Sequence, residues 1–114
     1  MKPDLNFRWD QLQNQLVQRF HKQLNLEALI YLIGLRELGE SPHREFSKEE
    51  KVDLMHIAIC RLLSQSGYYE LQGLDEEGWP HWKLVKDLPH ADIFSQEALL
   101  KEHILSYFEA EEVF

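Results

Sequence analysis

The chain has a single cysteine among its 114 residues, Cys60, so it cannot form an intramolecular disulfide. Small secreted domains commonly depend on disulfides, and residues 1–6 contain no apolar signal core. The longest apolar run, residues 28–35, is far shorter than the roughly 20 residues that a membrane-spanning helix needs. We therefore expect a cytoplasmic protein that does not cross a membrane.

Positive charge is also scarce. The sequence has 20 acidic residues against 12 Lys and Arg, which gives a net charge of -8. The basic residues are scattered, and the nearest approach to a cluster is Lys83 and Lys86 with Arg61. Nucleic acids and anionic membrane surfaces attract clustered Lys and Arg, so both are poor candidate partners.

Glycine and proline are few, with five and four residues, and the sequence has no repeat, low-complexity stretch or internal linker. Apolar residues make up 44% of the chain, which is typical of a globular protein rather than a disordered one. A chain of this length can bury one real core. We therefore expect a single globular domain over residues 1–114.

Hydrophobic periodicity predicts two helices in the first third. Apolar residues at spacings of three and four predict a helix over about 6–22; they are Leu5, Trp9, Leu12, Leu16, Val17, Phe20 and Leu24. A second, mostly apolar helix is predicted over 26–38, with Gly39 in a left-handed conformation after its end. Gly34 inside this helix costs about 1 kcal/mol relative to Ala, which close packing of another helix would explain.

The middle of the chain predicts a third helix, 48–65, that is apolar on almost every side and therefore enclosed. Ser47 and Glu50 have the spacing of a capping box, and Phe46 is placed for a hydrophobic staple with Val52. Gly67 is expected to end the helix.

The remaining residues predict a β-hairpin and a last helix. The strands are expected at 68–74 and 79–86, joined by a turn at 75–78, with Pro80 at an edge or a strand start. Ser95 is a candidate cap for a helix over about 96–109. The predicted fold is α+β and mainly helical, with about four helices and one antiparallel hairpin between the third helix and the last.

Two sets of residues could carry chemistry. Asp53, His56 and Cys60 lie on one face of the third helix, a spacing compatible with two or three metal ligands or with a reactive thiol. A narrow polar strip on a buried helix explains the same pattern, with Cys60 as a small hydrophobe. His81 and His90 near the acidic turn could act in acid–base catalysis, although acidic residues also suit a solvated turn. We predict no catalytic residues, metal site or cofactor.

The hairpin is rich in large aromatic residues. One layer of helices can cover only one face of a two-stranded hairpin, so part of this aromatic surface should remain available for contact. Trp and Tyr dominate the energetics of protein interfaces. We therefore predict that the hairpin binds a protein partner or a second copy of the chain, through Tyr68, Trp79, His81 and Trp82.

The order of elements over residues 26–86 resembles a winged helix domain: helices, then a helix ending in residues 62–68, then a hairpin wing through residues 75–78. That resemblance implies DNA binding. Residues 67–71 and 75–82 also look like a small family of uncharacterised bacterial proteins, which implies no activity. Three hypotheses follow: a non-enzymatic interaction or homodimerising module, a winged-helix DNA-binding regulator, and a small enzyme or metal-binding protein. The apolar third helix and acidic charge favour the first.

Overall fold

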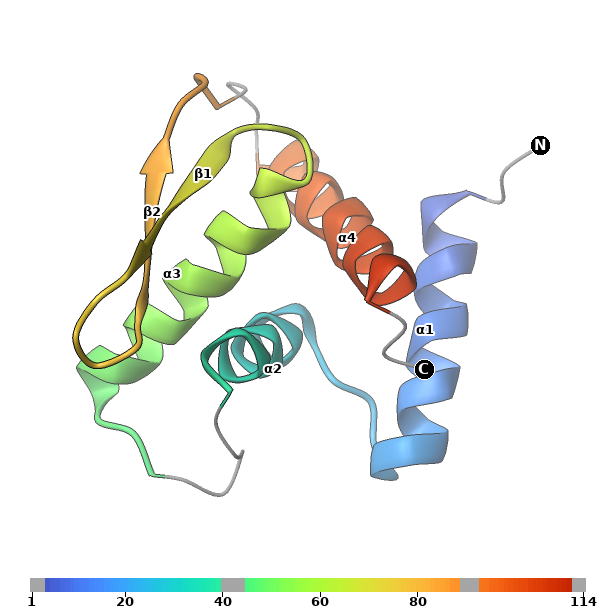
Figure 1. Ribbon diagram of the computed structural model, residues 1–114. Helices are drawn as coiled ribbons and strands as arrows, with labels where there is room; N and C mark the ends of the chain where they lie inside the picture. The colour runs from blue at the N-terminus through green and yellow to red at the C-terminus, as the bar shows by residue number, and fades with distance from the viewer. Residues whose placement is uncertain (1–3, 40–44, 89–92, 112–114) are drawn as a thin grey trace. The chain divides into compact units, whose positions relative to one another are not determined.

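The computed structural model describes residues 4–39, 45–88 and 93–111. Within these ranges the chain forms four helices and two strands (Figure 1): α1 (Leu5–Phe20), α2 (Leu26–Leu38), α3 (Lys48–Ser64), β1 (Tyr69–Leu74), β2 (Pro80–Leu84) and α4 (Ile93–Ala110). The strands pair antiparallel and form a hairpin between α3 and α4. The predicted α+β, mainly helical fold is confirmed. No helix in the described ranges is both long and apolar enough to span a membrane.

The chain divides into two compact parts, which we describe separately. The terminal part comprises residues 1–26 and 90–114, and the middle part comprises residues 27–89. In the terminal part, α1 packs against α4. Arg8 and Glu102 form an ion pair of 2.8 Å between the two helices, and the Lys101 ammonium lies 5.1 Å from the centroid of the Trp9 ring.

The ends of α1 differ from the predicted range of 6–22. Asp4 caps the helix, because its carboxylate accepts a hydrogen bond of 2.8 Å from the Phe7 backbone. The helix ends at Phe20 because His21 adopts a left-handed conformation with φ of 63°. Phe20 and Val17 were expected on the apolar face but are 44% and 40% exposed.

The last helix begins earlier than predicted. α4 starts at Ile93, so Ser95 lies inside its first turn and the prediction of Ser95 as the cap is wrong. Ile104, Tyr107 and Phe108 are buried as expected, whereas Leu100 is only half-buried.

In the middle part, α2 has the predicted bounds and packs closely on α3. A Cβ added at Gly34 would lie against the backbone carbonyl of Leu54, 2.8 Å from its carbon. The close approach of the two helices therefore requires glycine at this position. Gly39 follows the helix with φ of +78°, as predicted.

α3 begins as predicted and is less enclosed than expected. The capping box is present: the Ser47 hydroxyl accepts from the Glu50 backbone at 3.1 Å, and the Glu50 carboxylate accepts from the Ser47 backbone at 3.0 Å. The helix ends at Ser64, and Gly67, with φ of +80°, belongs to the turn beyond it. One side of the helix is buried, but Val52 is 61% exposed.

Phe46 packs differently from the predicted staple. It is buried with Leu35 and Leu54, and Trp79 of the hairpin packs on this group together with Tyr31 and Leu38. We call the three buried residues, Leu35, Phe46 and Leu54, the Phe46 cluster. Val52 cannot serve as the staple partner because it points largely into solvent. The cluster instead links α2, α3 and the hairpin.

Candidate functional site

The hairpin turn is organised by Asp75. One of its carboxylate oxygens accepts backbone hydrogen bonds of 2.9 Å from Glu77 and from Trp79, and the other contacts His81 Nε2 at 3.0 Å. The bond from the Trp79 backbone, followed by that from His81, lowers the pKa of Asp75. Gly78 supplies the positive φ that the turn needs, +86°. His81 is thus paired with the carboxylate that organises the turn, and His90, its proposed catalytic companion, lies outside the described residues.

The register of the hairpin gathers its apolar side chains on one face. Tyr69 pairs with Leu84, and Leu71 pairs with Trp82. Alternate residues along a strand share a face, and so do directly opposed residues. Gln72 has no partner, so the register shifts after Leu71. Beyond this bulge Leu74 pairs with Pro80, and both side chains lie on the same face as Leu71. We call the following residues the apolar face: Tyr69, Leu71, Leu74, Pro80, Trp82 and Leu84.

Coverage of the apolar face is incomplete. α3 contacts both strands of the hairpin, which lies across one side of this helix (Figure 1). Tyr69, Pro80 and Trp82 are half-buried. The three leucines remain outside, with exposed fractions of 48% for Leu71, 67% for Leu74 and 46% for Leu84.

The four residues predicted to bind a partner occupy different environments. His81 is exposed, with 64% of its side chain accessible. Tyr68 is half-buried, with the Lys86 ammonium 4.3 Å from the centroid of its ring. Trp79 packs on the Phe46 cluster. Trp82 is half-buried, and its Nε1 is enclosed without a hydrogen-bond partner among the described residues. Trp79 therefore helps to attach the hairpin to α2 and α3.

The exposed apolar side chains of the hairpin are aliphatic, and the sequence analysis missed them. Among the large hydrophobic residues that the described chain leaves exposed, five of nine lie between residues 71 and 88. They are Leu71, Leu74, Leu84, Val85 and Leu88. On β2, Trp82 and Leu84 alternate with charged or polar residues, and this pattern could have predicted that both lie on one apolar face. The bulge at Gln72 hid the same signal on β1, because it breaks the period of two.

A groove of about 400 Å³ lies between the hairpin and the N-terminal half of α3. Two indoles line it, those of Trp79 and Trp82. Its charged lining is acidic, with carboxylates from both elements and no Lys or Arg: Glu50, Asp53, Asp75 and Glu77. The groove thus combines aromatic walls with negative charge.

The cysteine of the proposed metal or thiol site on α3 is buried. Cys60 is fully buried, and its Sγ lies 3.5 Å from His56 Nε2. Burial raises the pKa of the Cys60 thiol to about 11, which disfavours the thiolate that nucleophilic attack needs. Asp53 and His56 are exposed. Across residues 4–39, 45–88 and 93–111, no three His, Cys, Asp or Glu side chains are arranged to hold a metal ion.

We expect Cys60 of the folded protein to react with a disulfide reagent such as dithionitrobenzoate at least about a hundredfold more slowly than free cysteine at pH 8. The reason is that the thiol is both buried and protonated. Full reactivity in urea is the control, and fast reaction of the folded chain would contradict this view of α3.

The same group makes stability depend on pH. Because the pKa of Cys60 lies above its ordinary value of 9.0 in the folded protein, the folded state holds the proton more tightly than the unfolded state. The resulting stabilisation is complete below pH 9 and is lost as the pH rises towards about 11. In urea unfolding, the free energy of unfolding of Cys60→Ala should therefore fall less between pH 9 and about 11 than that of the parent chain.

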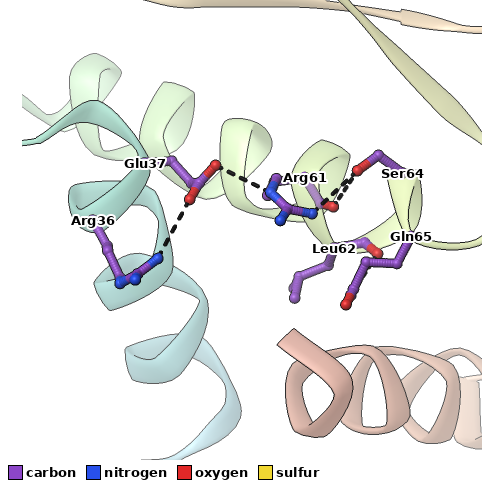
Figure 2. Close-up of polar contacts among 6 residues, drawn as sticks. All are labelled: Arg36, Glu37, Arg61, Leu62, Ser64 and Gln65. Carbon is purple, nitrogen blue, oxygen red and sulfur yellow. Dashed lines mark hydrogen bonds and ion pairs between the residues drawn. The ribbon is translucent and has the colours of Figure 1, made fainter. Parts of the chain in front are cut away.

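A polar network joins the ends of α2 and α3 (Figure 2). The Glu37 carboxylate lies 3.3 Å from Arg61 Nε and 3.8 Å from a guanidinium nitrogen of Arg36. On α3, the Ser64 hydroxyl donates to the Arg61 carbonyl, and the Gln65 amide donates to the Leu62 carbonyl at 2.9 Å. Arg61 is thus paired with Glu37, so its charge contributes little to a basic patch with Lys83 and Lys86.

Comparison of the chain with protein-family models, with curated proteins and with solved structures gives no significant match.

Proposed function

We propose that this protein is a non-enzymatic interaction module that binds a second copy of itself through the apolar face of its hairpin. The observation that carries the proposal is that three leucines of this face, Leu71, Leu74 and Leu84, remain exposed. Contiguous exposed apolar surface is typical of interaction sites on otherwise soluble proteins. The buried Cys60 thiol, whose pKa is raised, supports a non-enzymatic role.

The charge distribution along the hairpin favours a second copy as the partner. The tip is acidic, with Asp75, Glu76 and Glu77, whereas the base has Lys83 and Lys86 beside Glu70 and Asp87 and is close to neutral. A two-fold axis that sets two hairpins antiparallel brings each acidic tip to the base of the other hairpin. This arrangement keeps the two tips apart and joins uncharged leucines, as an isologous interface requires.

Face-to-face contact agrees better with the hairpin than pairing of strand edges. Pro80 has no backbone N–H to donate and Lys83 adds charge to β2, while the bulge at Gln72 and Gly73, with φ of +134°, interrupts β1. Prolines, lysines and bulges at sheet edges oppose the addition of further strands. We therefore assign the contact to the side chains of the apolar face.

Sedimentation equilibrium tests the proposal. We expect the parent chain to approach twice its mass of 13.6 kDa at high concentration. Leu71→Lys and Leu84→Lys should each weaken self-association by at least about tenfold, because a charge would be buried at the contact. Lysine also reduces the net negative charge, so a weaker dimer could not be attributed to added repulsion.

Val17→Lys is the matched control, because Val17 is a similarly exposed aliphatic residue on α1. It should leave the association constant within about twofold. A chain that stays monomeric at high concentration, or equal effects of all three substitutions, would rule out this interface.

The winged-helix hypothesis remains an alternative and makes the opposite prediction. A regulator of this class should bind random duplex DNA at low salt, with affinity that falls steeply as salt is added. Our proposal expects no such binding, since the hairpin tip and the groove beside it are acidic. A gel-shift titration at low salt distinguishes the two.

A further inference from the structure

The groove between α3 and the hairpin has the composition of a site for an organic cation. The carboxylates of Asp53 and Glu77 approach it from opposite elements, the helix and the turn. Neither carboxylate forms an ion pair or accepts a hydrogen bond within the described ranges. Two negative charges therefore line the same groove, one from each element. No Lys or Arg lines it; the two imidazoles in the lining are those of His81, which contacts Asp75, and His56.

The aromatic lining adds a second attraction for a cation. An ammonium group near the face of an indole gains about 0.5–2 kcal/mol from the ring quadrupole. Nε1 of Trp82 is enclosed within the protein, so the accessible part of this indole excludes its N–H, the edge that would repel a cation. Trp79 lines the same groove and is fixed by its packing on the Phe46 cluster.

The size and rigidity of the groove favour a small ligand. Its volume of about 400 Å³ lies within the range of small-molecule sites, roughly 300–1,000 Å³. The other two carboxylates are held in place: Asp75 by the turn and Glu50 by the capping box. Half of the negative charge is therefore held in fixed positions, which lowers the cost of binding.

We propose that this groove binds a linear organic polycation, such as a diamine or polyamine, with its ammonium groups at Asp53 and Glu77 and its methylene chain against Trp79 and Trp82. A flexible amine with charges at both ends matches carboxylates on two sides of an aromatic hollow, whereas a metal ion would need ligands converging on one point. The proposal is independent of self-association, because every residue that it uses belongs to one copy of the middle part.

Isothermal titration calorimetry with spermidine, at about 0.15 M salt so that diffuse attraction is screened, tests this site. We expect the double variant Asp53→Asn, Glu77→Gln to bind at least tenfold more weakly than the parent. The matched control is the double variant Glu49→Gln, Glu76→Gln. It also removes two negative charges, but from neighbouring exposed positions that do not line the groove. It should change the affinity by less than twofold.

Three results would overturn the proposal: no heat of binding at millimolar spermidine, equal losses in the two double variants, or tighter binding of a lysine-rich peptide than of spermidine. The last would assign the groove to a protein partner. Equal urea midpoints for the two double variants establish that any difference arises from binding and not from unfolding. If the chain is monomeric and still binds spermidine in this pattern, the proposed function fails while this site stands.

Discussion

Gly34→Val should destabilise the protein by at least about 3 kcal/mol, because the added side chain has no room between α2 and α3. The first added atom would already lie 2.8 Å from the carbonyl carbon of Leu54 and 3.2 Å from its Cβ. The obstacle is backbone, which cannot move aside as the end of a flexible side chain can. Urea unfolding measures the loss as a lower midpoint with an unchanged slope.

Gly34→Ala provides the sharper test, because helix propensity and packing predict opposite signs. Alanine in place of glycine inside a helix gains about 1 kcal/mol where space is available. We expect a net loss of about 1–2 kcal/mol instead, since the overlap with Leu54 outweighs that gain. Glu27→Ala, at an exposed position of the same helix, should stay within about 0.5 kcal/mol of the parent. A Gly34→Ala variant as stable as the parent would show that the helices do not approach as described.

Trp79→Ala should cost about 2–4 kcal/mol of stability, because it removes the indole that packs the hairpin on the Phe46 cluster. The estimate is below that for a fully enclosed tryptophan because Trp79 is half-buried. Trp79→Phe should recover much of the loss, since it keeps an aromatic ring against Phe46 and Leu54.

The control for Trp79 is Leu74→Ala, at a position on the same hairpin that is 67% exposed. It should change the free energy of unfolding by less than about 0.5 kcal/mol. A Trp79→Ala variant that unfolds at the parent's urea concentration would mean that the hairpin is not anchored through this residue. Because Trp79 affects stability, the leucine variants are the better probes of association.

The elements most predictable from the sequence are those defined by local signals. α2 has the predicted bounds because Gly39 ends it, and α3 begins where the Ser47 and Glu50 capping box places it. Gly78 and the acidic residues before it identify the turn, and Pro80 stands at the start of β2 as expected. In each case the residues that determine the structure lie within a few positions of one another.

The predictions that were wrong concern packing that depends on contacts between residues distant in the sequence. Phe46 was assigned to Val52, six residues away, but it packs on Leu35 of the preceding helix. The expectation that α3 is enclosed on nearly every side was too strong, since Val52, Asp53 and His56 are exposed. Periodicity identifies an apolar helix, but it cannot show which sides other elements reach.

The candidate site was found in part. The hairpin could be identified from its aromatic residues, but the sequence could not distinguish the rings that anchor it from the side chains that remain exposed. That distinction depends on Trp79 meeting the Phe46 cluster and on the bulge at Gln72, which returns Leu74 to the face of Leu71. Both depend on tertiary packing and register, which local patterns do not encode.

Hydrogen exchange followed by mass spectrometry, at low and high protein concentration, tests the central claim most directly. If the apolar face joins two copies, amides of residues 69–84 should exchange more slowly at high concentration, while those of α2 and the first turns of α3 stay unchanged. Exchange in the hairpin that is independent of concentration, in a sample whose mass has doubled, would place the contact elsewhere and contradict the account.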